Sequence, residues 1–384
     1  MKLILAALLV LQFAQRPPLT PAETLLEPVI LRAINEQPSG GAQATLIEGT
    51  DKSAGEILIT CRECVVAMHA MQKLHTLITE KGMPPPARSI RRVTAGIDEE
   101  TARRAKAAIH VAESDARPLQ VLRGLWSTAS AADEVVEIFA RHGSYLVDVR
   151  PFEDVGQLHL DRFGVPTTTI VTSPLVSNQH AAFVAAASAY FLATLPNTGA
   201  EALLSHLTVG AHARLAEDGR RAVAQMGNQQ RASGDVLVMF GQAIEREQRR
   251  MRSFERFMPE PIDPMLRSRI ADMEKGITSV WTSIGITSSP FVPASERLRG
   301  RAGEDRRVPA RNKPGAGGDV VPPAVLAKLP DSGIVIGELT NFIDGKRSIS
   351  DIRDAVAAEF GGVPLPAVVQ YFEALAKAGA VTLR

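Results

Sequence analysis

The sequence predicts an α/β protein: a mostly parallel sheet with helices on both faces, followed by a helical segment and a small C-terminal module. Two observations support this fold class. In residues 20–200, short β-branched runs alternate with amphipathic segments, which is the order that builds a parallel sheet. The run FGVPTTTIVTSP at 163–174 follows a Gly-Val-Pro turn and stops at Thr-Ser-Pro. That pattern is typical of a buried strand that ends at a cleft.

Periodicity and turn residues place the alternating elements. A helix should begin with Pro21 in its first turn and end at a Pro-Ser-Gly-Gly sequence. The run at 65–80 keeps its apolar residues near one side of a helix, and the strand EILIT precedes it. In chain order, the expected helices are 21–36, 65–80, 97–106, 131–142 and 177–195, and the expected strands are 44–48, 56–60, 89–94, 107–112 and 165–172.

Residues 201–286 show a helical pattern throughout, with helices expected at 211–226, 235–256 and 264–281. The middle helix carries a run of charged residues, which predicts a solvated face. These charged residues are Glu245, Arg246, Glu247, Arg249 and Arg250. Residues 287–333 are rich in Pro, Gly and Arg and predict a flexible linker.

The last unit, 334–384, should hold helices at 335–343, 349–360 and 364–378 and a strand at 380–383, with Ser348 as an N-cap. This element set suggests a winged-helix-like module. Its acidic and basic residues are nearly balanced, whereas a DNA-reading helix needs a basic stripe. The module is therefore expected to dock a peptide or protein and not a nucleic acid.

The composition agrees with a soluble globular chain. Hydrophobic residues make up 45% and charged residues 22%, and the formal net charge is +1. This charge gives no long-range attraction for nucleic acid, and aromatic residues at 5% offer few platforms for stacking bases. Nucleic-acid binding is accordingly not expected.

The amino terminus resembles an export signal. Lys2 precedes a short apolar run, and a plausible cleavage point lies near Ala14. Residues 1–15 are therefore interpreted as a signal peptide, with a buried first helix as the alternative, and a secreted or periplasmic location is expected. No other segment reaches the roughly 20 apolar residues that a bilayer span needs. We expect no stable membrane span after removal of the signal.

Residues with catalytic or metal-binding chemistry are few. The sequence contains no H-E-x-x-H, no G-x-S-x-G and no Gly-rich phosphate loop. The candidate catalytic residues are Glu99 and Glu100, an acid pair that follows a strand, and His159, which precedes the run at 163–174. The alternative for the acid pair is a helix N-terminus that favours negative charge. The candidate metal ligands are His110, Glu113 and His159.

The two cysteines, Cys61 and Cys64, form a C-x-x-C sequence. Two cysteines cannot make a disulfide scaffold in a secreted protein. The pair could close a small redox loop, or it could be two small buried residues between a strand and a helix.

Several stretches resemble the di-zinc aminopeptidase family, which also includes glutaminyl cyclases and the transferrin-receptor ectodomain. GEILITCREC is similar to the strand that ends in the family's first His ligand, and the stretch from VVAMHAMQKL to RSIRRV is similar to the next helix, Pro-rich loop and strand. AAIHVAES resembles the strand with a metal-binding Asp, and GQLHLDRFGVPTTTIVTSP resembles the Ser-Asp-His turn and the final His-Thr-Ser. The tail DGKRSISDIRDAVAAEF is similar to a C-terminal extension of some bacterial members.

The departures from the family fall on its metal ligands. The metal-binding Asp falls at about Ala112, beside Glu113, and the last His at about Val171. The first His falls near Cys61 or Arg62, and the loop with the bridging Asp is missing between Thr60 and Val65. Two adjacent zinc ions need a bridging carboxylate and several N or O ligands. The resemblance therefore implies a degenerate member of the family without a cofactor.

Three functions remain open from the sequence. The preferred one is a secreted, non-catalytic scaffold that binds a peptide or protein. The second is an active metallopeptidase-like hydrolase with a rearranged site that would hold zinc. The third is a periplasmic interaction protein with a redox-sensitive Cys61–Cys64 pair. The expected division is 1–15 signal peptide, 20–200 aminopeptidase-like domain, 201–286 helical extension, 287–333 linker and 334–384 winged-helix-like module.

Overall fold

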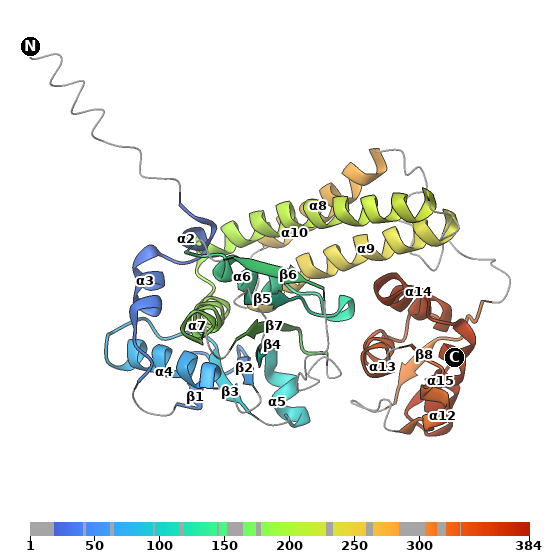
Figure 1. Ribbon diagram of the computed structural model, residues 1–384, viewed down its shortest axis with the longest axis horizontal. Coiled ribbons are helices and arrows are strands. Elements are labelled where there is room, and N and C mark those ends of the chain that lie inside the picture. Colours follow the sequence, from blue (N-terminus) through green and yellow to red (C-terminus); the bar gives the residue numbers. More distant parts are fainter. Residues whose placement is uncertain are drawn as a thin grey trace, which may run out of the picture.

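The computed structural model shows a central sheet, long helices across one side and a smaller C-terminal unit beside them (Figure 1). It describes residues 19–40, 44–61, 65–94, 97–114, 119–143, 146–151, 164–173, 178–227, 233–258, 264–283, 304–312, 320–330 and 332–384. The predicted signal peptide, 1–15, lies outside these residues, and so do Arg62, Cys64 and His159.

In the described residues, seven strands form one sheet in the order β1-β3-β2-β4-β7-β5-β6. Strands β3, β2, β4 and β7 are parallel, while β1 runs antiparallel to β3 and β5 antiparallel to β7. The carboxyl ends of the four parallel strands therefore lie at one edge, and β5 and β6 end at the opposite edge. The strands are β1 Leu46–Ile47, β2 Glu56–Cys61, β3 Ser89–Val93, β4 Ala105–Glu113, β5 Leu119–Leu122, β6 Val147–Arg150 and β7 Thr167–Thr172.

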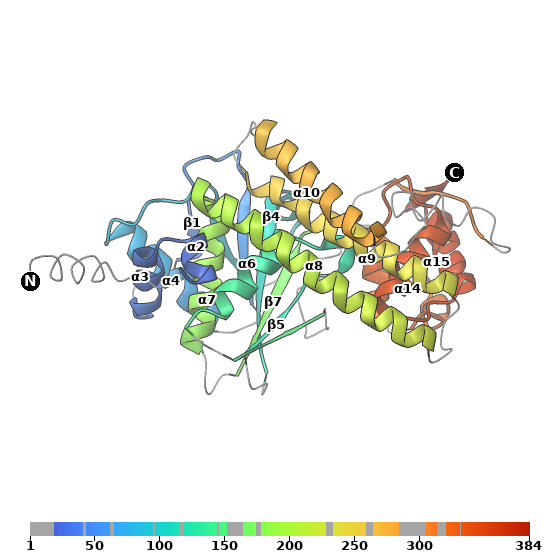
Figure 2. The same cartoon turned by 90° about the horizontal axis from the view of Figure 1, so that it is seen from above.

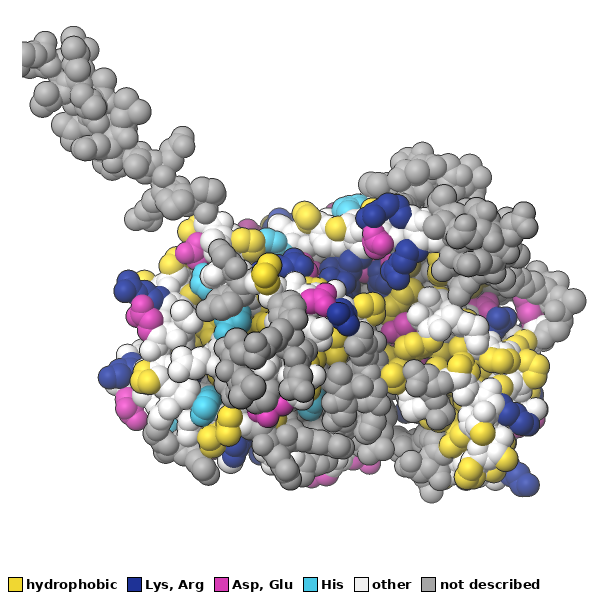
Figure 3. All heavy atoms as spheres, viewed as in Figure 1, with side chains coloured by type: hydrophobic (Ala, Val, Ile, Leu, Met, Phe, Trp, Pro, Cys, Tyr) yellow, Lys and Arg dark blue, Asp and Glu magenta, His cyan; other side chains and the backbone are white. Residues whose placement is uncertain are grey.

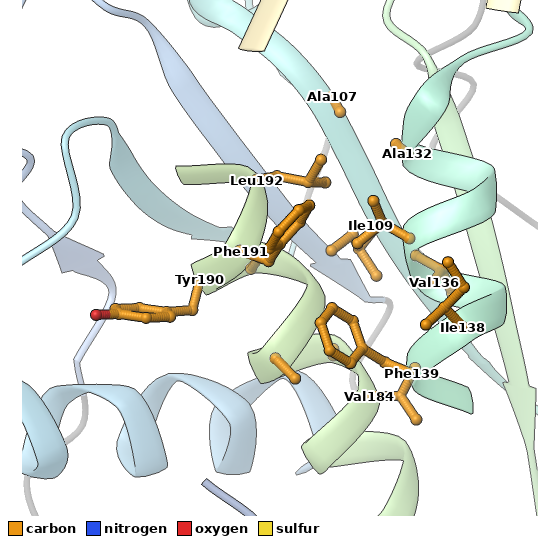
Figure 4. Packing of buried hydrophobic residues seen from close by; sticks show 14 of the residues in the cluster. Ala107, Ile109, Ala132, Val136, Ile138, Phe139, Val184, Tyr190, Phe191 and Leu192 are labelled. Carbon is orange, nitrogen blue, oxygen red and sulfur yellow. The ribbon is translucent and has the colours of Figure 1, made fainter. Parts of the chain in front are cut away.

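Helices α4 (Val65–Thr79), α6 (Ala131–Ala140) and α7 (Asn178–Thr194) cover one face of the sheet (Figure 1). The central helix is α7, which contacts β2, β3, β4 and β7 as well as both neighbouring helices. Its sequence is apolar on all sides, as expected for a helix buried within a core. Figure 4 shows Phe191 of α7 and Phe139 of α6 beside Ile109, and the two rings meet edge-on at 6.0 Å.

The opposite face of the sheet carries α5 (Glu99–Arg104). Its Ala102 packs with Leu58, Ala108 and Val165. Side chains alternate along a strand, so Leu58 and Ala108 point away from the face that holds Ile109 and α7. Helices thus lie on both faces of a mostly parallel sheet, and the predicted fold class is confirmed.

Two long helices, α8 (Asn197–Gly227) and α9 (Ser233–Ser253), pack along one another and cross one side of the sheet and its covering helices (Figure 2). The described residues from 19 to 283, these helices included, are called the body below. Helix α10 (Pro264–Ser283) packs against both. The helical character predicted for 201–286 is confirmed for the described residues 201–227, 233–258 and 264–283, although α8 begins earlier than expected. Two short helices, α2 (Pro21–Leu25) and α3 (Pro28–Glu36), contact α8 and α7 respectively.

The C-terminal unit has its own buried core. It contains α12 (Pro323–Leu326), α13 (Ser332–Asn341), α14 (Ile349–Phe360) and α15 (Leu365–Lys377), and β8 (Pro309–Arg311) pairs antiparallel with β9 (Val381–Leu383). Ser348 caps α14, as expected, in a capping box with Asp351. Strand β8 differs from the expectation, because it lies within the predicted linker and yet belongs to this unit. The winged-helix assignment stays a prediction.

Three local predictions differ from the structure, each for a physical reason. The helix expected at 21–36 is broken before Pro28, because a residue that precedes proline avoids helical backbone angles. The helix expected at 97–106 ends at Arg104, and β4 begins at Ala105. Strands β5 and β6 were not expected, since each has only four residues and no long apolar run. Among the described helices, none combines the length and apolar composition that a bilayer crossing would require.

Candidate functional site

The carboxyl edge of the four parallel strands is the candidate site, because ligands of open α/β sheets bind there. Its described strand ends are Cys61, Val93, Glu113 and Thr172. Cys61 is fully buried and disulfide-bonded, and the only other cysteine in the sequence, Cys64, lies outside the described residues. Of the two interpretations of C-x-x-C, the disulfide agrees with this finding.

A row of polar side chains crosses the sheet just before this edge. Thr60, His110 and Thr169 are register partners on β2, β4 and β7, so they share one face. The hydroxyl of Thr60 and Nδ1 of His110 are 2.9 Å apart, and the two residues are 0% and 2% exposed. A hydroxyl next to an imidazole is the arrangement of an activated nucleophile. Here both groups lack the exposed surface through which a substrate would reach them.

Glu113 does not join His110 at this edge. The two candidates lie on the same strand, three positions apart. Because side chains alternate along a strand, an odd spacing places them on opposite faces of the sheet. His110 is buried, whereas Glu113 is exposed at the last position of β4. These two candidate metal ligands therefore cannot both reach one ion, and the third, His159, lies outside the described residues.

The candidate acid pair lies near the start of β4, away from the carboxyl edge. Glu100 forms an ion pair with Arg103 at 2.8 Å. Hydrogen bonds from this guanidinium lower the pKa of Glu100, and a carboxylate with a lowered pKa is a weaker base. Asp98 accepts a hydrogen bond from the Thr101 backbone N–H at 2.7 Å as the N-cap of α5. Glu99 is the first residue of α5. These contacts agree with the alternative interpretation, in which the acidic residues stand at a helix N-terminus that favours negative charge.

Apolar residues occupy two of the positions that the resemblance assigns to metal ligands. Ala112 and Val171 are register partners on β4 and β7, and both pack with Leu122 of β5. They are 8% and 1% exposed. In the described parts of the chain, no group of three His, Cys, Asp or Glu side chains comes close enough to hold a metal ion.

The largest cluster of buried charge lies instead on α9, where the sequence predicted a solvated face. That prediction is wrong. The side chain of Glu247 is 0% exposed and forms ion pairs with Arg214, Arg246 and Arg250 at 3.0, 2.6 and 3.2 Å. Burial alone would raise the pKa of Glu247, but the three guanidinium charges outweigh it and lower the pKa. Figure 3 shows basic side chains gathered beside α8 and α9.

Acidic residues from α6 and α8 complete this cluster. Arg214 also binds Glu134 at 2.8 Å, Arg246 binds Asp218 at 2.9 Å, and Arg250 binds Asp133 at 3.0 Å. A charged residue can be buried when several opposite charges and hydrogen bonds replace its water. The sequence did contain one signal for this buried cluster. The run Ala-Ala-Asp-Glu-Val-Val-Glu of α6 places carboxylates within an otherwise apolar helix, and such carboxylates need cationic partners when they are buried.

A cavity of about 330 Å³ lies beside the cluster, between the body and the C-terminal unit. Trp126 forms part of its wall, and the guanidinium of Arg246 lies 4.6 Å from the centre of the indole ring. The inner arginines already pair with carboxylates, so the charge inside the wall is largely neutralised. The wall residues from the C-terminal unit are Ala358, Glu359, Phe360 and Gly361.

No protein-family model and no curated protein sequence matches this chain. Among solved structures, an aminopeptidase from Aneurinibacillus sp. strain AM-1 aligns with 38% of this chain and 46% of its own, at 11% identity and a TM-score of 0.30. A putative peptidase from Clostridium acetobutylicum aligns with 88% of this chain and 59% of its own, at 14% identity and a TM-score of 0.27. This chain thus spans about half the length of each, and similarity at this level establishes no shared activity.

Proposed function

We propose that this chain is a non-catalytic relative of the zinc aminopeptidases and acts as a binding scaffold for a peptide or protein. One observation carries the proposal. The positions assigned by sequence resemblance to the metal-binding Asp and the last His hold Ala112 and Val171, which pack together with Leu122. Alkyl side chains cannot donate electron pairs to zinc, and an apolar cluster opposes the entry of a hydrated ion.

The remaining polar groups are engaged within the protein, which argues against catalysis. His110 is engaged with Thr60, and Glu100 is engaged with Arg103. The buried hydroxyl and imidazole groups near the strand ends can join neighbouring strands, but a ligand has no exposed surface through which to reach them. Glu113, the exposed carboxylate at the end of β4, lies on the opposite face of the sheet and is not placed to serve them as a general base.

The proposal includes export and a docking role for the C-terminal unit. Lys2 and the apolar run that follows it support export, with cleavage near Ala14. Amino-terminal sequencing of protein recovered from outside the cytoplasm tests that part directly. A mature chain that still begins at Met1 contradicts it.

Metal analysis and turnover test the proposal together. The purified full chain, incubated with excess zinc and then desalted, is expected to retain far less than one zinc ion per chain. It is also expected to show no aminopeptidase turnover on a panel of aminoacyl substrates. About two zinc ions per chain, which a di-metal hydrolase needs, together with turnover would end the proposal.

A second candidate function is a hydrolase with a rearranged site, and the Thr60–His110 pair is the observation that favours it. Substitution H110A or H159A should then abolish a measurable hydrolase activity, and the retained metal would be zinc. H75A on α4 is the matched control, because His75 is not among the candidate residues of the rearranged site. Activity that persists in both test variants, or an inactive wild type, removes this candidate.

A further inference from the structure

The C-terminal unit is fastened to the body through two carboxylates. Glu359 of α14 accepts the backbone N–H of Trp126, with both oxygens 3.2 Å from the nitrogen. Glu338 of α13 accepts the next backbone N–H, that of Ser127, at 2.8 Å, and also the Ser127 hydroxyl. Two neighbouring amides of the short 3₁₀ turn η1 (Trp126–Thr128) are thus bound by acidic side chains from two helices of the other unit.

The two carboxyl groups are neighbours, because they bind consecutive backbone amides. Glu338 is 0% exposed. Two ionised carboxylates this close repel each other, so a proton on one of them relieves the repulsion. Burial, and next the negative charge of Glu338, raise the pKa of Glu359 well above its ordinary value. The docked unit therefore keeps a proton at pH values where an exposed carboxyl group has already lost it.

Nearby cations do not replace this proton. The guanidinium of Arg249 donates to the Trp126 carbonyl at 2.5 Å, and Arg246 is occupied by Glu247 and Asp218. Burial and the neighbouring Arg347 lower the pKa of Arg249 to about 10, so that this residue stays charged at neutral pH. The charged groups that face the carboxyl pair are Glu245, Arg246 and Arg249 of α9, Arg347 between α13 and α14, and, across the cavity, Arg123, Arg214, Glu217, Asp218, Arg221 and Arg250.

We propose that a proton on Glu359, beside the carboxyl group of Glu338, holds the C-terminal unit on the body, so that docking weakens as the pH rises. Below the ordinary pKa of a carboxyl group, Glu359 is protonated in both the docked and the released states, and docking is at full strength. Above it, the docked state keeps a proton that the released state has lost. Each further pH unit then lowers the docking constant by up to about tenfold, until the raised pKa of Glu359 is passed.

Release of the unit would also open the cavity at the interface. Residues Ala358–Gly361 supply one of its walls and would leave with α14. The surface uncovered on the body carries Trp126 and the arginines of α9. The proton thus controls access to a surface that the docked state keeps closed.

Hydrogen exchange of the bound amides tests this directly. The amides of Trp126 and Ser127 are protected by the two carboxyl groups, so their protection factors report on docking. In the wild-type full chain, these factors, corrected for the intrinsic pH dependence of exchange, should fall by up to about tenfold per pH unit above about pH 5 and level off once the raised pKa of Glu359 is passed. Amides of β4, such as those of Ile109 and Val111, serve as the internal reference for global opening.

Substitution E359Q imitates the protonated carboxyl group, because its amide can donate to Glu338 and accept from Trp126. We expect the protection in E359Q to be independent of pH and, at about pH 8, at least tenfold above wild type. E338Q removes the neighbouring negative charge and leaves the burial of Glu359, so it should weaken the pH dependence without abolishing it. E373Q is the control, since Glu373 lies on α15 with its side chain 51% exposed and paired with Arg307, and its pH dependence should match wild type.

The proposal is overturned if, in the wild type, the protection factors of the Trp126 and Ser127 amides do not change with pH when compared with those of the β4 amides. Persistence of the wild-type pH dependence in both E359Q and E338Q also overturns it. A merely structural role for Glu359 would lower the protection of the glutamine variant equally at all pH values.

Discussion

The carboxyl edge of the sheet and the interface around α9 differ in whether their buried side chains are charged. At the edge, buried positions hold Ala112, Val171 and the Thr60–His110 pair. Around α9, the fully buried Glu247 is surrounded by arginines, and every one of these has a second acidic partner. This chain therefore uses its buried ionic groups to join helices, and it buries alkyl side chains at the strand ends.

The difference also shows how a fold can tolerate buried charge. An isolated ion in an apolar core loses its hydration, and a single partner rarely compensates for that loss. Glu247 contacts three guanidinium groups, and Asp133 adds hydrogen bonds from Gly124 N–H at 3.1 Å and the Thr168 hydroxyl at 2.6 Å. Ala112 and Val171 pack with Leu122, so a carboxylate placed there would meet alkyl side chains among the described residues of that cluster.

The largest effect is expected from E247Q. The variant removes the central negative charge and leaves three buried guanidinium groups with fewer partners, which should cost about 3–5 kcal/mol of the free energy of unfolding. Urea denaturation at neutral pH measures the loss. Because the pKa of Glu247 is held below its ordinary value, its contribution is present above that value and is lost as the pH falls. The gap between wild type and E247Q should therefore narrow in acid.

The matched control is E217Q on α8. Glu217 is 48% exposed on its side chain and pairs with Arg220, so its removal should cost less than about 1 kcal/mol. Equal losses in the two variants would contradict the view that the cluster around Glu247 is a buried network.

A smaller but substantial effect is expected from A112D, which restores a carboxylate at the edge. The new carboxylate would be buried against Val171 and Leu122, and the described residues of this cluster offer it no cation, so the substitution should cost about 2–3 kcal/mol. Because an apolar site raises the pKa of a carboxyl group, the loss should grow as the pH rises. Urea denaturation at two pH values measures it.

Zinc and a size control sharpen this prediction. Added zinc should not restore the stability of A112D, because the neighbouring Val171 has no electron pair to offer a metal. A112S changes the same position without introducing a charge and should cost markedly less. Recovery of A112D by zinc would instead show that the edge can still assemble a metal site, which counts against the proposed scaffold.

Local patterns predicted the regular elements well. Helix α14 begins and ends at the predicted residues, since Ser348 caps it and Gly361 follows it. Strand β2 was predicted within one residue, because a short β-branched run between turn residues is a local signal. Such features depend on neighbours in the sequence, so the sequence alone contains what determines them.

Features that depend on contacts between residues far apart in the sequence could not be predicted from local patterns. The charge run of α9 was interpreted as solvated because its partners, such as Asp133 and Arg214, lie far away in the sequence. Strands β5 and β6 are too short to stand out, and they form by pairing with β7 and with each other. The sequence also could not reveal that His110 and Glu113 face opposite sides until the bounds of the strand were known.

The smallest effect is expected from T60V at the edge. Valine keeps the shape of threonine but removes the hydroxyl that lies 2.9 Å from Nδ1 of His110. Loss of one buried hydrogen bond should cost about 1–2 kcal/mol, less than the removal of a charge from the α9 cluster. Urea denaturation measures it, and T60S is the control, because it keeps the hydroxyl and loses only a methyl group.

Two outcomes for T60V would change the comparison between the regions. If T60V destabilised the chain as strongly as E247Q, the edge would contain a polar network of comparable importance, and the contrast would fail. If T60V were neutral, the Thr60–His110 contact would contribute nothing to folding. The contrast would then be wider, because this buried polar pair would add no stability while the cluster around Glu247 does.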